Sequence, residues 1–75
     1  MPKRDSLLAA LGQNVRRQRE ARSLTQENLA ERANLDPTYI SGIERGVRNP
    51  GIKVVIRLAR ALGVTVDQLC KGVDA

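Results

Sequence analysis

Aromatic residues, histidine and cysteine are nearly absent from this chain of 75 residues, which contains one Tyr, one Cys and no His, Phe or Trp. The core must therefore consist of Leu, Ile, Val and Ala, and a row of aromatic rings that stack on single-stranded bases is excluded. One Cys cannot form an internal disulfide, and a lone Cys without His does not make a metal site. We therefore predict no metal ion and no cofactor.

Long apolar runs and catalytic constellations are also missing. No apolar run approaches the ~18 residues of a membrane span, and the short apolar patch after Lys3 and Arg4 does not support a signal peptide. The single Cys lacks a base, and neither a carboxylate pair nor a glycine-rich phosphate loop is present. We therefore expect a cytoplasmic protein that is not an enzyme and has no membrane partner.

The charge balance indicates a polyanionic partner instead. Thirteen basic and eight acidic residues give a net charge of +5, which favours nucleic acid, although a merely soluble basic surface has the same excess. The length allows one domain, expected over residues 1–75 with its core at about 6–70. It leaves no room for a ligand-binding or self-cleaving domain, so no small-molecule ligand is expected. Lys3 and Arg4 form either a phosphate-contacting arm or a solvated terminus.

Apolar residues at helical spacing predict five helices with short connections, and hence an all-α orthogonal bundle. A first helix is expected over Ser6–Arg22, with Ser6 as its cap and one apolar face of Leu8, Leu11 and Val15. A fourth is expected over Ile52–Leu62, with an apolar face of Ile52, Val55, Leu58, Ala59 and Leu62. A capping box of Thr65 and Gln68 opens a fifth helix, which runs through Leu69 and Cys70.

Between them, Thr25–Arg48 is expected to form two short helices around a tight turn. Thr25 is a preferred N-cap, and Asn34 tolerates the left-handed conformation that such a turn requires. Asp36 caps the second helix, and Pro37 suits its first position. The pair matches a helix-turn-helix unit, whose second helix enters the major groove of DNA.

Three motifs in this stretch resemble the lambda-repressor-like (XRE-type) helix-turn-helix family, namely T-Q-x-x-L-A-x-x-A, Y-I-S-G-I-E-R-G and R-N-P. The resemblance covers roughly Leu8 to Leu69 and implies a five-helix DNA-binding bundle. It implies close packing at Gly12. It also implies a partly buried ion pair between Arg19 and Glu44, which ties the first helix to the recognition helix.

A recognition helix that enters the groove by its N-terminal end places four residues closest to the base edges: Pro37, Thr38, Ser41 and Gly42. These residues lack the bidentate fork that discriminates bases best, so direct readout is expected to be modest. Specificity is then expected from DNA shape, or from Arg45 and Arg48. The resemblance adds Gln26 as a phosphate anchor.

In size and in the motif Y-I-S-x-x-E-R-G-x-R-N, the chain is most similar to the controller proteins of restriction–modification systems. In those proteins the residues that face DNA match Thr38, Tyr39, Ser41, Arg48 and Asn49. They commonly have Arg in place of Pro37. Tyr39 is expected either to contact a phosphate or to pack against the helix, and Arg45 is either a phosphate contact or simply surface. Arg17 completes the basic rim.

Relatives bind as two-fold dimers to half-sites ~34 Å apart, so a homodimer is expected. Its interface is predicted at the C-terminal end, at Val64, Val66, Leu69, Cys70 and Val73, unless these residues complete the monomer core. We therefore predict a sequence-specific regulator of transcription that binds double-stranded DNA at a two-fold operator and controls its own gene. It would act at a bacterial or phage nucleoid, with a restriction–modification controller as the leading subtype.

Three alternatives stay open: a phage repressor, an antitoxin, or a protein–protein adaptor that uses the same bundle. An adaptor would not need a basic rim, and the rim here includes Arg16, Arg17, Arg45 and Arg48.

Overall fold

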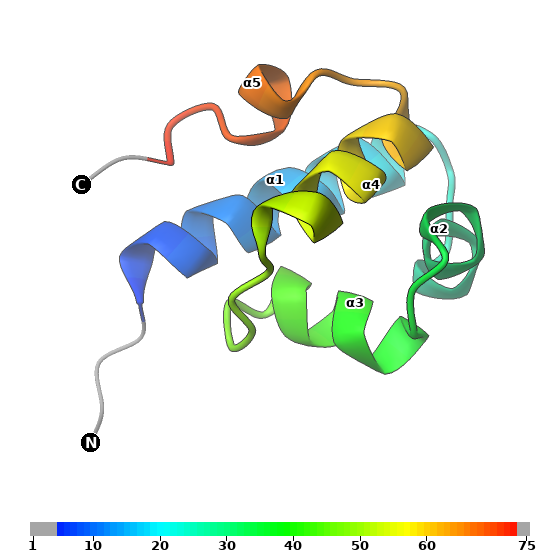
Figure 1. Cartoon of the computed structure of the whole chain (residues 1–75), viewed down its shortest axis with the longest axis horizontal. Helices are drawn as coiled ribbons and strands as arrows, with labels where there is room; N and C mark the ends of the chain where they lie inside the picture. The colour runs from blue at the N-terminus through cyan, green and yellow to red at the C-terminus, as the bar shows by residue number, and fades with distance from the viewer. Residues whose placement is uncertain (1–4, 74–75) are drawn as a thin grey trace.

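The computed structural model describes residues 5–73, so the arm considered at Lys3 and Arg4 lies outside the described residues. Within that range the chain forms five α-helices and no strand (Figure 1), which confirms the all-α fold class. The helices are α1 Ser6–Ala21, α2 Gln26–Ala33, α3 Pro37–Glu44, α4 Ile52–Leu62 and α5 Val66–Leu69.

The longest helices, α1 and α4, run side by side through the middle of the molecule, with α5 on one side of them and α3 on the other (Figure 1). α2 packs against α3 and α4 at the end of the bundle. The core between these helices is aliphatic, as the lack of aromatic residues requires. Its fully buried large side chains include Val15, Leu29, Ile40, Ile43, Leu58, Leu62 and Leu69.

The predicted capping residues of α2, α3 and α5 are confirmed. Thr25 and Asp36 cap α2 and α3 through side-chain hydrogen bonds, and Asn34 is left-handed at φ 55°. Thr65 and Gln68 form the expected capping box of α5. A second capping box, between Thr25 and Asn28, was not predicted. These caps satisfy backbone N–H groups that a helix leaves unpaired in its first turn.

Two predictions about the ends of helices α1 and α4 were wrong. Asp5, not Ser6, caps α1, because its carboxylate accepts hydrogen bonds from the N–H groups of Leu7 at 2.9 Å and Leu8 at 3.2 Å. Ile52 does not join the core but is 65% exposed. It is the first residue of α4, and helical side chains lean toward the N-terminus, so its side chain projects past the helices that cover the rest of that face.

Candidate nucleic-acid interface

The two sides of α3 have different environments. Ile40 and Ile43 are buried in the core, and Glu44 is buried at the last turn. Pro37 and Thr38 at the first turn are exposed. Tyr39 and Ser41 are half-buried, and Tyr39 packs partly against the core. α3 therefore exposes its first turn at Pro37 and Thr38, while the side that carries Ile40 and Ile43 faces the core.

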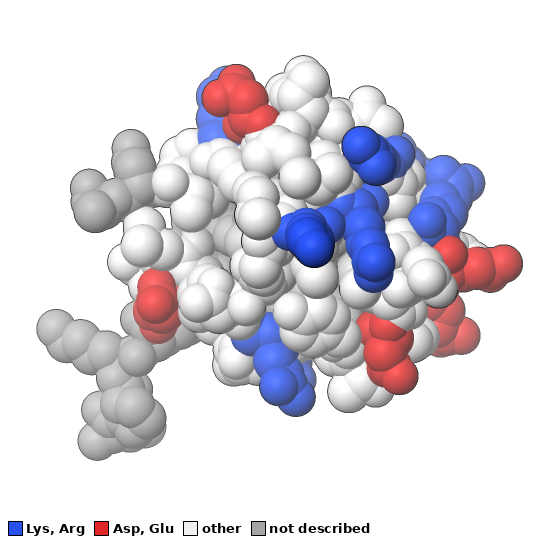
Figure 2. Space-filling model, in the orientation of Figure 1, with Lys and Arg blue, Asp and Glu red and all other residues white. Residues whose placement is uncertain are grey.

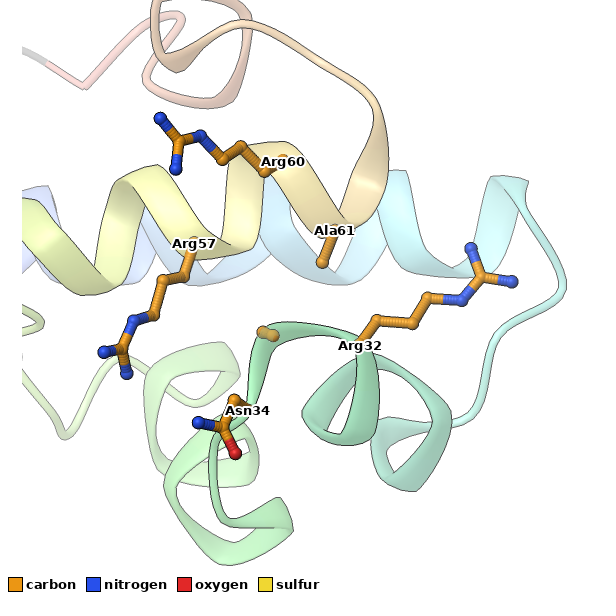
Figure 3. A pocket seen from close by; sticks show the side chains of 6 residues that line it. Arg32, Asn34, Arg57, Arg60 and Ala61 are labelled. Carbon is orange, nitrogen blue, oxygen red and sulfur yellow. The ribbon is translucent and has the colours of Figure 1, made fainter.

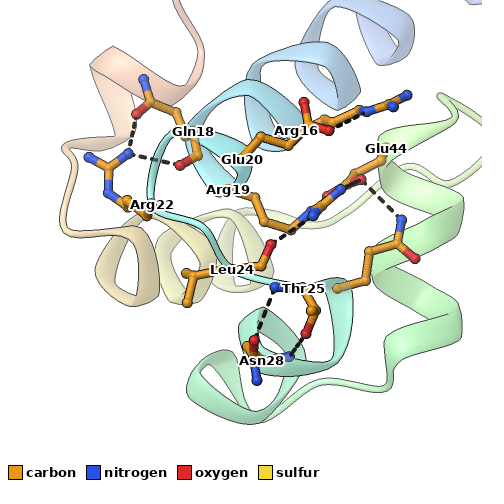
Figure 4. A network of polar contacts seen from close by, with 10 residues as sticks. Arg16, Gln18, Arg19, Glu20, Arg22, Leu24, Thr25, Asn28 and Glu44 are labelled. Carbon is orange, nitrogen blue, oxygen red and sulfur yellow. Dashed lines mark hydrogen bonds and ion pairs between the residues drawn. The ribbon is translucent and has the colours of Figure 1, made fainter.

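A partly buried ion pair holds the inner side of α3. Arg19 on α1 donates from Nε to Glu44 Oε2 at 2.7 Å and from Nη2 to Glu44 Oε1 at 3.0 Å (Figure 4). Its third donor, Nη1, binds the Leu24 carbonyl oxygen at 2.8 Å. The hydrogen bond with Glu44 raises the pKa of Arg19, against the lowering effect of burial. The ion pair expected between α1 and the recognition helix is therefore present, in the two-pronged geometry that Arg and carboxylate favour.

Glu44 also reaches α2. Gln26, in the first turn of α2, donates from Nε2 to Glu44 Oε1 at 3.0 Å. A carboxylate only accepts hydrogen bonds, so the amide nitrogen of Gln26 has to face it. One amide N–H of Gln26 is thereby used inside the protein. Glu44 thus links the start of α2, the end of α1 and the end of α3 in one network.

Gly42 is not an open patch on α3, which corrects the expectation that it lies closest to the base edges. It is buried, because the side chain of Arg48 crosses directly over it. A Cβ added at Gly42 would lie 2.5 Å from Arg48 Cγ and 3.5 Å from Arg48 Nε. The surface at this point of α3 is therefore formed by Arg48.

The loop after α3 brings Arg48 back to the helix. Gly46 turns the chain at φ 75°, and the Gly42 carbonyl oxygen accepts hydrogen bonds from the N–H groups of Val47 at 3.0 Å and Arg48 at 3.2 Å. Arg45, Arg48 and Asn49 are all exposed. Two segments of the predicted DNA-contacting set, the outer turn of α3 and this loop, therefore form one continuous surface.

Arg17 does not join that surface. It lies two residues before Arg19, and a helical step of about 100° per residue turns the two side chains to nearly opposite faces of α1. Its Nη1 donates to Asn14 Oδ1 at 3.3 Å, and the Asn14 amide in turn donates to the carbonyl oxygens of Leu69 and Lys71, both at 2.8 Å. Arg17 therefore lies beside the end of α5, away from α3.

The structural role of Asn14 was not predicted from the sequence. Its side chain is buried and fastens α5 to α1. The signal was present, because Leu11, Asn14 and Val15 share the i, i+3, i+4 spacing of a buried stripe. A polar residue in such a stripe has to find hydrogen-bond partners, and free backbone carbonyl groups at the end of a short helix are suitable ones.

The five residues predicted for the dimer interface fall into two groups by their burial. Leu69 is 0% exposed and belongs to the monomer core, which corrects its assignment to an interface. The other four are partly buried and pack against that core from outside: Val64, Val66, Cys70 and Val73. They remain candidates for contact with a second copy.

A second basic surface, a cleft lined by arginines, lies on another face of the molecule. Basic side chains gather over α4 and toward the α2 end in Figure 2, and a cavity of about 320 Å³ lies there. It is lined by Arg32, Ala33, Asn34, Arg57, Arg60 and Ala61. The arginine side chains diverge instead of meeting at one point (Figure 3), so the cleft does not define an anion site.

Residues 5–73 contain no cluster of His, Cys, Asp and Glu able to hold a metal ion. In the same range, no helix is both long and apolar enough to cross a membrane.

Two short helices around a left-handed turn, with the second held by a partly buried ion pair and exposed on its outer side, define a helix-turn-helix protein. The chain belongs to the XRE-type helix-turn-helix family, whose family model matches residues 15–69. This confirms the family expected from the three motifs.

Restriction–modification controller proteins are among its relatives. Control protein C.SmaI of Serratia marcescens is 44% identical over 59 residues, which cover 79% of this chain and 70% of that protein. The structure of controller protein C.AhdI from Aeromonas hydrophila matches with a TM-score of 0.81 at 40% identity, over 83% of this chain and 94% of that one.

The C.Esp1396I controller tetramer in complex with its natural 35 base-pair operator matches with a TM-score of 0.77 at 41% identity, over 81% of this chain and 80% of that one. Among curated relatives that are 39–44% identical to it, the chain spans between 41% and 83% of the relative's length.

Proposed function

We propose that this chain is a sequence-specific, double-stranded-DNA-binding regulator of transcription that acts as a homodimer and controls its own gene. The observation that carries the proposal is the arrangement of α3. Its inner side is fixed by Glu44 to both α1 and α2, and its outer turn is exposed beside a loop with Arg45 and Arg48. A rigid helix with one free, basic-flanked side suits insertion into a major groove.

Each remaining site residue has a definite role in this proposal. Thr38 and Ser41 meet base edges from the outer turn of α3, and Pro37 packs against the groove wall. Tyr39 and Asn49 contact the sugar–phosphate backbone, as does Arg45. Gln26 donates its second amide N–H to a phosphate at the N-terminus of α2, where the helix dipole favours an anion.

The subtype proposed is a restriction–modification controller, because relatives of this class cover most of the chain at 40% identity or more. A regulator of this kind needs no catalytic group, so we propose that the chain is not an enzyme. It would act in the cytoplasm, at the nucleoid.

The test is an anisotropy titration of a labelled duplex from upstream of this chain's gene, with a scrambled duplex as control, at 50 mM and 200 mM salt. We expect tight binding to the upstream duplex that survives the higher salt, while binding to the scrambled duplex collapses. Equal, salt-sensitive binding to both duplexes would contradict autoregulation. No binding to either at 50 mM salt would contradict DNA binding and favour a protein–protein adaptor.

We further propose that Val64, Val66, Cys70 and Val73 form the dimer interface. Val66→Glu would place a charge in an apolar contact and should shift sedimentation toward the monomer, weakening operator binding without touching α3. Ala61→Glu, at a half-buried position in the cleft near Arg57, is the matched control and should stay dimeric. A Val66→Glu protein with wild-type sedimentation and binding would refute this interface.

A further inference from the structure

Gly42 occupies the middle of α3 without any conformational reason to be glycine. The glycines with positive φ among the described residues are Gly46, Gly63 and Gly72, so Gly42 has an ordinary helical backbone. Alanine would favour the helix more strongly at such a position. Some other property must therefore account for glycine here, and the available space is the property that the structure displays.

That space is occupied by Arg48. The Cβ that Gly42 lacks would stand 2.5 Å from Arg48 Cγ, closer than two carbon atoms can approach, and 3.6 Å from Arg48 Cβ. The aliphatic stem of Arg48 thus lies against the bare backbone of α3. The neighbouring atoms are those of a flexible side chain, so a methyl group at Gly42 would displace the stem without breaking the fold.

The backbone fixes the starting point of that stem. The Gly42 carbonyl oxygen binds the N–H groups of both Val47 and Arg48, so the α-carbon of Arg48 is held over the last turns of α3. From there the side chain crosses Gly42, and Arg48 Nε lies 3.5 Å from the missing methyl position. The guanidinium therefore leaves from the surface of the recognition helix and not from the tip of the loop.

We infer that Gly42 is a positioning residue for DNA recognition: its missing side chain forms a seat that orders the stem of Arg48 and directs its guanidinium along the outer side of α3. This inference rests on the proposed DNA-binding function. Ordering a long side chain before binding reduces the rotamer entropy lost in the complex. It also gives α3 the forked donor that Thr38 and Ser41 do not provide.

The fork would bind a pair of acceptor oxygens or nitrogens on the duplex, either guanine O6 and N7 or phosphate oxygens. These two sources have different signatures. Removing a guanine contact relaxes preference at one base pair, whereas removing a phosphate contact weakens binding to all sequences and reduces the salt slope by about one.

The experiment is a double-mutant cycle on the duplex that wild-type protein enriches most from a random pool. Gly42→Ala, Arg48→Ala and the double variant are titrated on it, and each is also used to re-select the pool. We expect Arg48→Ala to weaken binding about tenfold or more, the size of one good side chain–base contact. Gly42→Ala should weaken it roughly fivefold, and the double variant should match Arg48→Ala within about twofold.

Three results of these titrations would overturn the inference. Gly42→Ala could bind as wild type. The double variant could bind more weakly than Arg48→Ala by the full factor that Gly42→Ala causes alone. That would mean that DNA approaches Gly42 directly. Gly51→Ala, which adds a methyl where nothing lies within 4 Å, could weaken binding as much as Gly42→Ala.

An NMR measurement on the free protein tests the seat itself. A contact between the Gly42 α-protons and the Arg48 γ-protons is expected in the wild type, and its absence would overturn the inference whatever the variants do. If wild-type protein enriches no sequence at all, the proposed function fails. If it enriches one and the cycle is additive, only the role of Gly42 fails.

Discussion

The inner and outer sides of α3 each combine a glycine with an arginine, but the two pairs work differently. On the inner side, a Cβ on Gly12 of α1 would meet the backbone carbonyl oxygens of Ile43 and Glu44, the latter at 2.6 Å. There the arginine, Arg19, is locked to a buried carboxylate. On the outer side, a Cβ on Gly42 would meet only the stem of Arg48, whose residue is exposed.

This difference separates stability from recognition. On the inner side the neighbouring atoms are backbone or buried charge and cannot easily move aside, so changes there should destabilise the fold. On the outer side the neighbouring atoms belong to the stem of one exposed side chain, which can move aside, so changes there should leave the fold intact and alter only what α3 binds.

The largest effect is expected from Glu44→Ala. It leaves the Arg19 guanidinium buried without its carboxylate and removes the partner of Gln26, which should lower the free energy of unfolding by ~3–5 kcal/mol. Urea denaturation measures this. Glu20→Ala is the control: it breaks the exposed pair with Arg16 at 3.3 Å and removes only a minor charge interaction with Arg19, and it should cost below ~0.5 kcal/mol. Equal midpoints for the two variants would refute the anchoring role.

The second largest loss of stability is expected from Gly12→Ala. The added methyl presses on the backbone of α3, and overpacking of this kind costs ~1–3 kcal/mol, partly offset by better helix propensity. Thermal unfolding of Gly12→Ala beside Gly42→Ala is the comparison, since both variants add one methyl to a helix. We expect a lower midpoint for Gly12→Ala and an unchanged or higher one for Gly42→Ala. The reverse order would remove the distinction between the two sides.

Asn14→Ala tests the opposite face of α1. It leaves the carbonyl oxygens of Leu69 and Lys71 without the Asn14 amide, at a cost of ~1–3 kcal/mol reduced by access to water. Hydrogen exchange should accelerate at the amides of α5 and leave those of α3 unchanged. Faster exchange at Ile40 and Ile43 as well would show that α5 supports the recognition helix after all.

Thr38→Ala should have the smallest effect on stability. The residue is exposed and its side chain is not the cap of α3, so the unfolding free energy should stay within ~0.5 kcal/mol. Binding to the enriched duplex should still weaken several-fold, by loss of one hydrogen bond. A variant with wild-type affinity would remove Thr38 from the interface.

Much of the fold could be predicted from the sequence, because its signals are local. Thr25, Asn34, Asp36 and Gly63 act through their own backbone neighbours, and each has the role that its residue type predicts. The ion pair between Arg19 and Glu44 joins residues 25 apart. It could be expected only from the family resemblance, since spacing alone does not bring α1 and α3 together.

The features that could not be predicted from the sequence depend on residues that are neighbours only in the folded protein. Whether Gly42 is open or covered depends on how the loop after α3 returns Arg48 to the helix. The direction of Arg17 depends on which face of α1 meets α3, and that face is defined by Gly12 and Arg19. Leu69 has the same apolar character as Val66, and only the packing of α5 buries Leu69 in the core and leaves Val66 partly buried at its edge.

The central claim is that α3, held from inside by Glu44, presents its outer turn and the Arg48 loop to DNA. The most direct test is an NMR titration of isotope-labelled protein with the upstream duplex, followed by amide shifts. We expect the largest changes to cluster at Gln26, at 37–42 and at 47–49, with little change at Arg17 and α5. Largest changes at Arg32, Arg57 and Arg60, in the basic cleft beside α4, would contradict it.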